Sequence, residues 1–186
     1  MGKKVILLIS LALMSGLSCA LAQNCKNMEN KDFHKEMMRR AIRLSEESVN
    51  KGGGPFGAVI VKDGKIVGEA SNSVTIDNDP TAHAEVNAIR KACSNLGTFE
   101  LDGCTIYTSC EPCPMCLGAI YWAHIDKIYY GNDAKDAASI GFDDDFIYKE
   151  IDLAPADRRT KMEELLPDEA IKAFDMWRNK TDKTEY

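Results

Sequence analysis

The chain has 186 residues, of which 45% are hydrophobic and 28% are charged, and its formal net charge is −6. These proportions exclude an intrinsically disordered chain and are typical of a folded globular protein. The acidic balance is a poor match for a nucleic-acid backbone, whose binders usually carry a basic face. We therefore expect a small-molecule substrate and no nucleic-acid partner.

The N-terminus predicts a secretory signal peptide. A basic start is followed by an apolar run, and residues 20–22 read Ala-Leu-Ala, which is the order found in a signal cleaved after a small residue. Three segments are expected: a cleaved signal over 1–22, a flexible start of the mature chain over 23–31, and one domain over 32–186. The expected location is secreted or periplasmic, without membrane contact after cleavage. An uncleaved, membrane-anchored form is the alternative.

Helices and strands are predicted in alternation after residue 32. Residues 32–50 repeat apolar side chains at helical spacing, and two β-rich runs then flank Asp63-Gly64, the strongest short signal for a hairpin. A capped helix ending at Gly97 comes next. It is followed by a strand, a helix with Pro112 at its first position, and a last strand. This order favours a three-layer α/β/α fold with a mixed central sheet of about five strands.

The cysteines point to a metal. Three of the seven cysteines crowd into residues 109–116, and such crowding favours a metal site over a disulfide framework. Cys113 and Cys116 share one helical turn, and the positive N-terminal end of that helix favours thiolates. His83 adds an imidazole nitrogen, so that the set of two sulfurs and one nitrogen selects zinc. Three protein ligands leave the fourth tetrahedral position for a water or hydroxide, as in catalytic zinc sites.

A closed structural zinc site is the alternative, with Cys110 as the fourth ligand. Cys110 precedes Pro112 and so lies outside the helical turn that carries the other two cysteines. A closed site would also leave Glu85, two residues after His83, without a function beside the metal. The H-x-E and P-C-x-x-C motifs, each opening a predicted helix, together favour the open site.

On these motifs the chain resembles the cytidine-deaminase-like superfamily and, within it, the bacterial guanine deaminases. The similar stretches include "GGPFGAVIVKDG", "NDPTAHAEVNAIRKAC", "IYTSCEPCPMCLGAIYWA" and "GFDDDFIYKEI", and the similarity covers roughly residues 32–186. The resemblance implies one zinc ion per chain on His83, Cys113 and Cys116. It also implies hydrolysis of guanine to xanthine and ammonia, with Glu85 as the proton shuttle.

The resemblance also assigns residues that contact the substrate. Asn72 falls on a family position that hydrogen-bonds the purine, and an asparagine offers both a donor and an acceptor. Asp144 falls on a carboxylate that accepts hydrogen bonds from the N–H groups of guanine. Phe56 and Trp122 are candidates for stacking on the base, although aromatic residues in such places more often belong to the core.

The C-terminal segment is expected to complete the site of a second chain. A helix is predicted after Pro167, with Ile171, Phe174 and Trp177 along one side, and an apolar face on so short a helix needs a partner surface. In the guanine deaminases this segment crosses to a partner subunit and covers its active site. The resemblance therefore implies a domain-swapped homodimer in which Tyr186 helps to close the purine pocket.

Two other functions stay open. One is deamination of another base or nucleoside, namely cytosine, cytidine or adenosine in tRNA, although the acidic charge disfavours tRNA. The other is a non-catalytic binding module that zinc stabilises. The release of ammonia from one of these substrates separates the possibilities.

Overall fold

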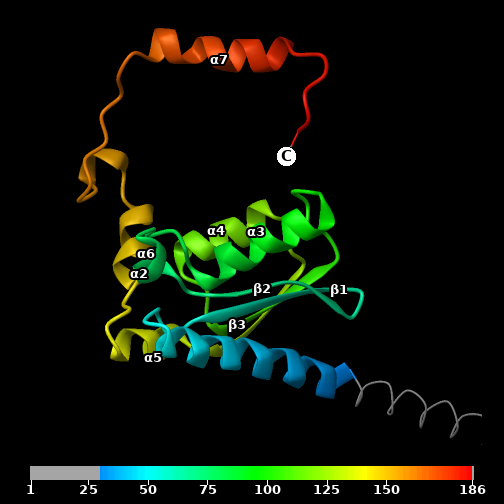
Figure 1. Ribbon diagram of the computed structural model, residues 1–186. Coiled ribbons are helices and arrows are strands. Elements are labelled where there is room, and N and C mark those ends of the chain that lie inside the picture. The colour runs from blue at the N-terminus through cyan, green and yellow to red at the C-terminus, as the bar shows by residue number, and fades with distance from the viewer. Residues whose placement is uncertain (1–29, 186) are drawn as a thin grey trace, which may run out of the picture.

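The computed structural model describes residues 30–185, and its centre is a four-stranded sheet in the order β2-β1-β3-β4 (Figure 1). β1 pairs antiparallel with both β2 and β3, whereas β3 and β4 are parallel because a helix connects them. The predicted α/β class and the mixed sheet are confirmed, but the described chain has four strands instead of about five. The strands are β1 (Gly57–Lys62), β2 (Lys65–Ser71), β3 (Cys104–Cys110) and β4 (Lys127–Asn132).

The predicted hairpin joins β1 to β2. Asp63 and Gly64 form its two-residue loop with φ angles of 49° and 74°, and Lys62 pairs with Lys65 across it. Two successive positive φ angles match the right-handed twist of the flanking strands, and Asp-Gly tolerates them at low cost. The local sequence therefore sets the register of this hairpin.

Helix α1, which the structure describes from residue 30 to residue 50, covers one face of the sheet and is drawn in blue and cyan in Figure 1. Met37, Ala41 and Leu44 are buried on its inner side. They pack in one cluster with Val59 and Tyr107 of the sheet. The apolar face predicted from the helical spacing is confirmed.

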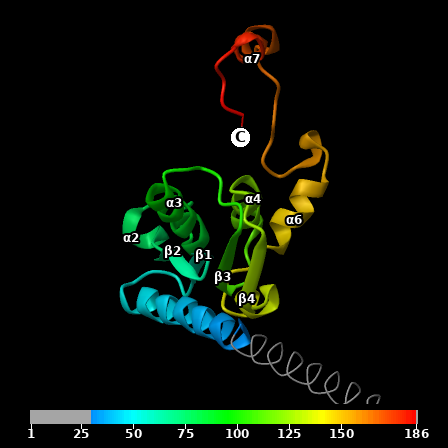
Figure 2. The same cartoon turned by 90° about the vertical axis from the view of Figure 1, so that its right-hand side faces the viewer.

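Helices α3 (Ala84–Leu96) and α4 (Pro114–Trp122) lie side by side on the opposite face (Figure 2). α3 ends as predicted at Gly97, whose φ of 68° is the left-handed conformation that suits glycine. The predicted start of α4 at Pro112 is wrong. The helix begins at Pro114, because Cys113 adopts an extended conformation and serves as the N-cap residue.

Small residues let α3 lie directly on β2. Ala84, Ala88 and Ala92 have no exposed surface. A Cβ atom added to Gly68 of β2 would come within 2.5 Å of the Ala88 carbonyl oxygen and 2.8 Å of the Ala92 Cβ. The height of α3 above the sheet is thus fixed by backbone contact, which also fixes where the N-terminus of α3 lies.

The remaining elements lie at the edges of this body. α2 (Val74–Asp77) follows β2, and α5 (Ala134–Ser139) and α6 (Asp145–Asp152) follow β4. After a 3-10 turn at Pro155–Asp157, the predicted last helix is confirmed as α7 (Pro167–Asn179).

Figures 1 and 2 show α7 standing apart from the sheet and from the helices that cover it. The predicted apolar side is uncovered in the single chain: Ile171 is 46% exposed, Phe174 is 70% exposed and Trp177 is 42% exposed. An amphipathic helix of this length gains most of its stability from packing that face.

Three predictions lie wholly or mostly outside the described residues. They are the signal peptide over 1–22, the flexible start over 23–31, of which residues 30 and 31 belong to α1, and the terminal Tyr186. Within residues 30–185, no helix is both long enough and apolar enough to cross a membrane.

The contact between α3 and β2 predicts the effect of two glycine substitutions. We expect Gly68→Ala to lower the free energy of unfolding by about 1–3 kcal/mol, because the added methyl group has backbone atoms in its way. Gly118→Ala in α4 is the matched control. No atom outside the backbone of its own helix lies within 4 Å of the new methyl group. We therefore expect this change to raise the free energy of unfolding by about 0.5–1 kcal/mol. Urea denaturation measures the free energy of unfolding of both variants. Equal stability of the two would contradict the close packing of α3 on β2.

Candidate active site

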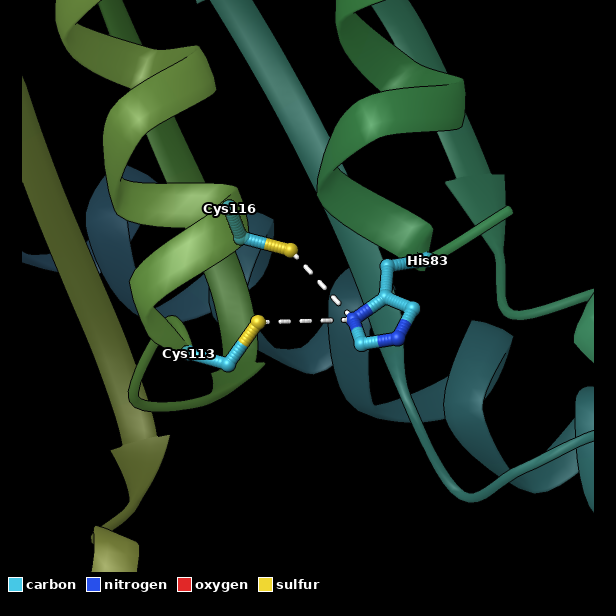
Figure 3. A group of neighbouring side chains, drawn as sticks. All are labelled: His83, Cys113 and Cys116. Atoms are coloured by element: carbon cyan, nitrogen blue, oxygen red, sulfur yellow. Dashed lines mark hydrogen bonds between the residues drawn. The ribbon is translucent and has the colours of Figure 1, made fainter. Parts of the chain in front are cut away.

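Three metal-binding side chains meet where α3 and α4 begin (Figure 3). His83 is the N-cap residue of α3, Cys113 is the N-cap residue of α4, and Cys116 lies one turn into α4. The His83 Nδ1 atom is 3.5 Å from each of the two sulfur atoms. All three donor atoms lie within 4.8 Å of one another, so the structure brings the predicted ligands together.

These distances fit zinc. With Zn–S bonds of about 2.3 Å and a Zn–N bond of about 2.0–2.1 Å, a tetrahedral angle at the metal places nitrogen and sulfur about 3.5 Å apart. The two measured N···S distances of 3.5 Å match this value, with Nδ1 as the ligating atom. Two thiolates and one imidazole are also the soft donors that zinc prefers.

The protons of the three donors are strongly coupled. A hydrogen bond from the Cys116 thiol, followed by one from His83, lowers the pKa of Cys113 to about 4 despite its burial. The same thiolate raises the pKa of Cys116 through that hydrogen bond, and burial raises it further. Hydrogen bonding to Cys113 also raises the pKa of His83. The cysteine pair thus shares one negative charge, and a bound cation takes the place of the remaining protons.

Glu85 lies beside this cluster and is only 5% exposed. Its Oε1 atom accepts a hydrogen bond from the Thr108 hydroxyl at 3.2 Å, and its Oε2 atom is 3.4 Å from the Cys116 sulfur. Burial is the main cause that raises the pKa of Glu85. A carboxyl group with a raised pKa is suited to take up a proton and to release it again.

Cys110 takes a different position. Its thiol donates to the Asp133 carbonyl oxygen at 3.7 Å, and burial raises its pKa to about 11. Of the cysteines in residues 30–185, Cys113 and Cys116 alone join His83 in the donor cluster. The arrangement therefore corresponds to the open site and not to the closed one.

A cavity of about 510 Å³ opens beside the donor cluster. This volume is in the range of sites for small organic ligands. A larger groove of about 680 Å³ runs along α1 and β4, but it contains none of the groups that converge here. The residues that line the 510 Å³ cavity include His83, Glu85, Cys113, Asn72, Asp144, Phe56 and Phe142.

Asn72 is buried at the end of β2, with a defined orientation. Its Oδ1 atom accepts hydrogen bonds from the backbone N–H groups of Gly54 and Val74, each at 3.2 Å. An atom that receives two N–H groups must be the carbonyl oxygen, so the amide orientation is settled. With Oδ1 occupied by these two N–H groups, the Nδ2 amino group is the part of the side chain that stays available for a further hydrogen bond, and it only donates.

Asp144 and two phenylalanines complete the cavity. Asp144 is half-buried at the N-terminus of α6, and burial, followed by the negative Cys113, raises its pKa. Phe56 meets Phe142 edge to face, with ring centroids 5.0 Å apart. Trp122 lies elsewhere, in a separate groove that it lines with residues of α7.

Two residues near the site escaped the sequence analysis. Phe142 carried no signal, because an aromatic residue beside an acidic loop is not distinctive. Thr108 is one residue of a β-rich run, and its contact with Glu85 joins positions 23 apart in the chain. Only the tertiary structure shows that Thr108 of β3 and Glu85 of α3 are in contact.

Residues 31–132 match the family described as the cytidine and deoxycytidylate deaminase zinc-binding region. The chain belongs to this deaminase family. Zinc is accordingly its cofactor, with His83, Cys113 and Cys116 as the donors that the structure assembles.

Individual relatives show which deaminases the chain is similar to. The chain is 56% identical to the guanine deaminase of Bacillus subtilis over 154 residues, which cover 82% of this chain and 99% of the relative. The crystal structure of that enzyme superimposes with a TM-score of 0.80, over 82% of this chain and 98% of the other. A tRNA-specific adenosine deaminase of Aquifex aeolicus is 44% identical over 93 residues, covering 50% of this chain and 62% of the relative.

The predicted secreted or periplasmic location is wrong in the light of these relatives. The match to the Bacillus subtilis enzyme covers 99% of that enzyme and 82% of this chain. The sequence prediction depended only on the composition of residues 1–22, which the structure does not describe.

The ligand assignment predicts how three cysteine substitutions differ. Cys113→Ser and Cys116→Ser should each lose bound zinc, because a serine hydroxyl is a poor replacement for a thiolate ligand. Cys110→Ser should keep one zinc ion per chain, since its thiol contacts a backbone carbonyl group instead. Elemental analysis of the purified proteins measures the zinc content. Loss of zinc from Cys110→Ser would contradict the three-ligand site.

Proposed function

We propose that this deaminase hydrolyses guanine to xanthine and ammonia. The observation that carries the proposal is the 56% identity to a guanine deaminase over 99% of that enzyme's length. The site agrees with it, because a buried carboxyl group lies beside a zinc-binding cluster at the wall of a cavity of about 510 Å³. Hydrolytic deamination needs an activated water, a group that moves protons, and a pocket that holds a flat base.

Glu85 is the proposed proton shuttle. When held by His83, Cys113 and Cys116, zinc would lower the pKa of a water molecule to about 7 and so supply a nucleophile at neutral pH. Oε2 of Glu85 lies 3.4 Å from the Cys116 sulfur atom and is the oxygen atom that would accept a proton there, while Oε1 contacts the Thr108 hydroxyl group. Glu85 would then deliver that proton to a ring nitrogen of the purine. It would next carry the second proton of the added water, from the new hydroxyl group on C2, to the amino group, so that the C–N bond breaks and ammonia leaves.

Asn72 and Asp144 are proposed to orient the base. The Asn72 amino group donates to an acceptor of guanine, since its carbonyl oxygen is already taken by two backbone N–H groups. An ionised Asp144 only accepts, so it suits the N–H groups of the ring. Phe56 and Phe142 present an aromatic surface in the same cavity. A base with both donors and acceptors on its edge matches this combination.

A homodimer with exchanged C-terminal segments is the proposed assembly. α7 leaves its apolar side exposed in the single chain. Among the described residues, the lining of the cavity ends at Ile147, so neither α7 nor the tail up to residue 185 contributes to the chain's own site. The proposal is one deaminase domain over 32–186 whose last segment, with Tyr186, closes the cavity of a partner subunit.

The assay for the function uses four substrates and one variant. The zinc-loaded protein should release ammonia from guanine and much less from adenine, cytosine or cytidine. Glu85→Gln keeps the size of the side chain but cannot shuttle protons, so its kcat should fall by at least about 10²-fold. Its zinc content serves as the control and should match that of the unchanged protein. Preference for another substrate, or near-normal turnover by Glu85→Gln, would refute the proposal.

The exchanged segment is tested by complementation. Deletion of residues 180–186 should sharply reduce guanine turnover while zinc content and folding persist, because the cavity then stays open to water. Co-expression of this deleted chain with Glu85→Gln should restore part of the activity, since a mixed dimer has one site with both Glu85 and a donated tail. As a control, a chain with both changes should restore nothing to Glu85→Gln. An active monomer, or full activity of the deleted chain, would disprove the exchange.

A further inference from the structure

Thr108 occupies a rigid position in the middle of the sheet. It lies on β3, where Ala58 of β1 and Tyr130 of β4 flank it on either side. Its side chain is 1% exposed, although it carries a hydroxyl group. A buried polar group in a central strand needs hydrogen-bond partners, because desolvation without them is costly.

The Thr108 hydroxyl has two partners, and one of them is Glu85. It is 3.2 Å from Oε1 of Glu85 and 2.9 Å from the carbonyl oxygen of Cys110. A hydroxyl group has one hydrogen to donate and two lone pairs that accept. It can therefore stay in contact with Glu85 whether the carboxyl group accepts a hydrogen bond or, once it carries a proton, donates one.

The other side-chain contact of Glu85 is with one of the metal ligands. The Cys116 sulfur atom lies 3.4 Å from Oε2. A cysteine that ligates zinc is a thiolate and has no hydrogen left to donate. The contact between Thr108 and Oε1 does not involve a metal ligand.

We propose that Thr108 is a positioning residue that orients the carboxyl group of Glu85 toward the metal site. By holding Oε1, the sheet turns Oε2 to the side on which the metal and the substrate meet. The inference rests on the proposed function, because it assigns Glu85 the role of proton shuttle. A misplacement of about 1 Å in a reacting group costs up to about 10²-fold in rate, so one fixed hydrogen bond has a large effect.

In a purely structural role, Thr108 would only donate a hydrogen bond to the carbonyl group of Cys110. Two variants at Thr108 and one at its neighbour distinguish this role from positioning. Thr108→Val keeps the shape and removes the hydroxyl group, whereas Thr108→Ser restores it. Ser109→Ala is the matched control, because Ser109 is also buried on β3 and its hydroxyl oxygen accepts from the Gly57 N–H at 3.0 Å. Neighbouring side chains of a strand point to opposite faces, so this change does not touch Glu85.

The expected kinetic result separates turnover from binding and stability. Thr108→Val should lower kcat about 10-fold or more and change KM by less than about 3-fold, because the carboxyl group acts on bound substrate. Thr108→Ser should recover most of kcat. Ser109→Ala should lower the melting temperature by a similar amount to Thr108→Val but keep kcat within about 2-fold. Zinc content should be one ion per chain in every variant.

Crystal structures of the zinc-loaded proteins give a second readout that does not depend on activity. Glu85 should have one orientation in the unchanged protein and in Thr108→Ser, and a rotated or divided orientation in Thr108→Val. If Thr108→Val does not fold, Thr108→Ala takes its place. Absence of guanine turnover in the unchanged protein would count against the proposed function, and the orientation of Glu85 would still decide the positioning role. An unchanged Glu85 in Thr108→Val, or an equal loss of kcat in Ser109→Ala, would overturn the inference.

Discussion

The contact of α3 with β2 fixes where the chemistry of this protein takes place. The helix lies on the strand with only glycine and alanine between the two backbones, so its height and its N-terminus have little freedom. His83 caps that N-terminus, and the neighbouring α4 is capped by Cys113. The distance of 3.5 Å from the His83 imidazole nitrogen to each sulfur atom therefore follows from the way in which α3 and α4 pack on the same sheet.

Charge imposes the second constraint on the site. Two cysteines, a histidine and a buried glutamate are crowded together, and without a cation the two cysteines share one negative charge. Burial also holds the pKa of Glu85 above its ordinary value. Zinc supplies positive charge at the one place where all four groups meet, so metal binding, thiolate formation and the state of the glutamate are coupled.

The cavity is built from segments far apart in the chain, and each brings a different kind of group. The end of β2 provides Asn72 as a donor, the start of α6 provides Asp144 as an acceptor, and Phe56 and Phe142 provide aromatic surface. The zinc donors and Glu85 form the remaining wall. Directional polar groups around an apolar surface recognise a flat heterocycle better than either kind of group alone.

The sequence by itself determined the hairpin at Asp63-Gly64, the apolar faces of α1 and α3, and the three zinc donors, because short-range patterns encode these features. The number of strands, the start of α4 and the single hydrogen-bonding role left to Asn72 were decided by tertiary structure. So was the contact of Thr108 on β3 with Glu85 on α3, two residues that lie 23 positions apart in the chain. A spacing of three or four residues is fixed by the geometry of a helix, whereas a contact between a strand and a helix depends on how closely they pack.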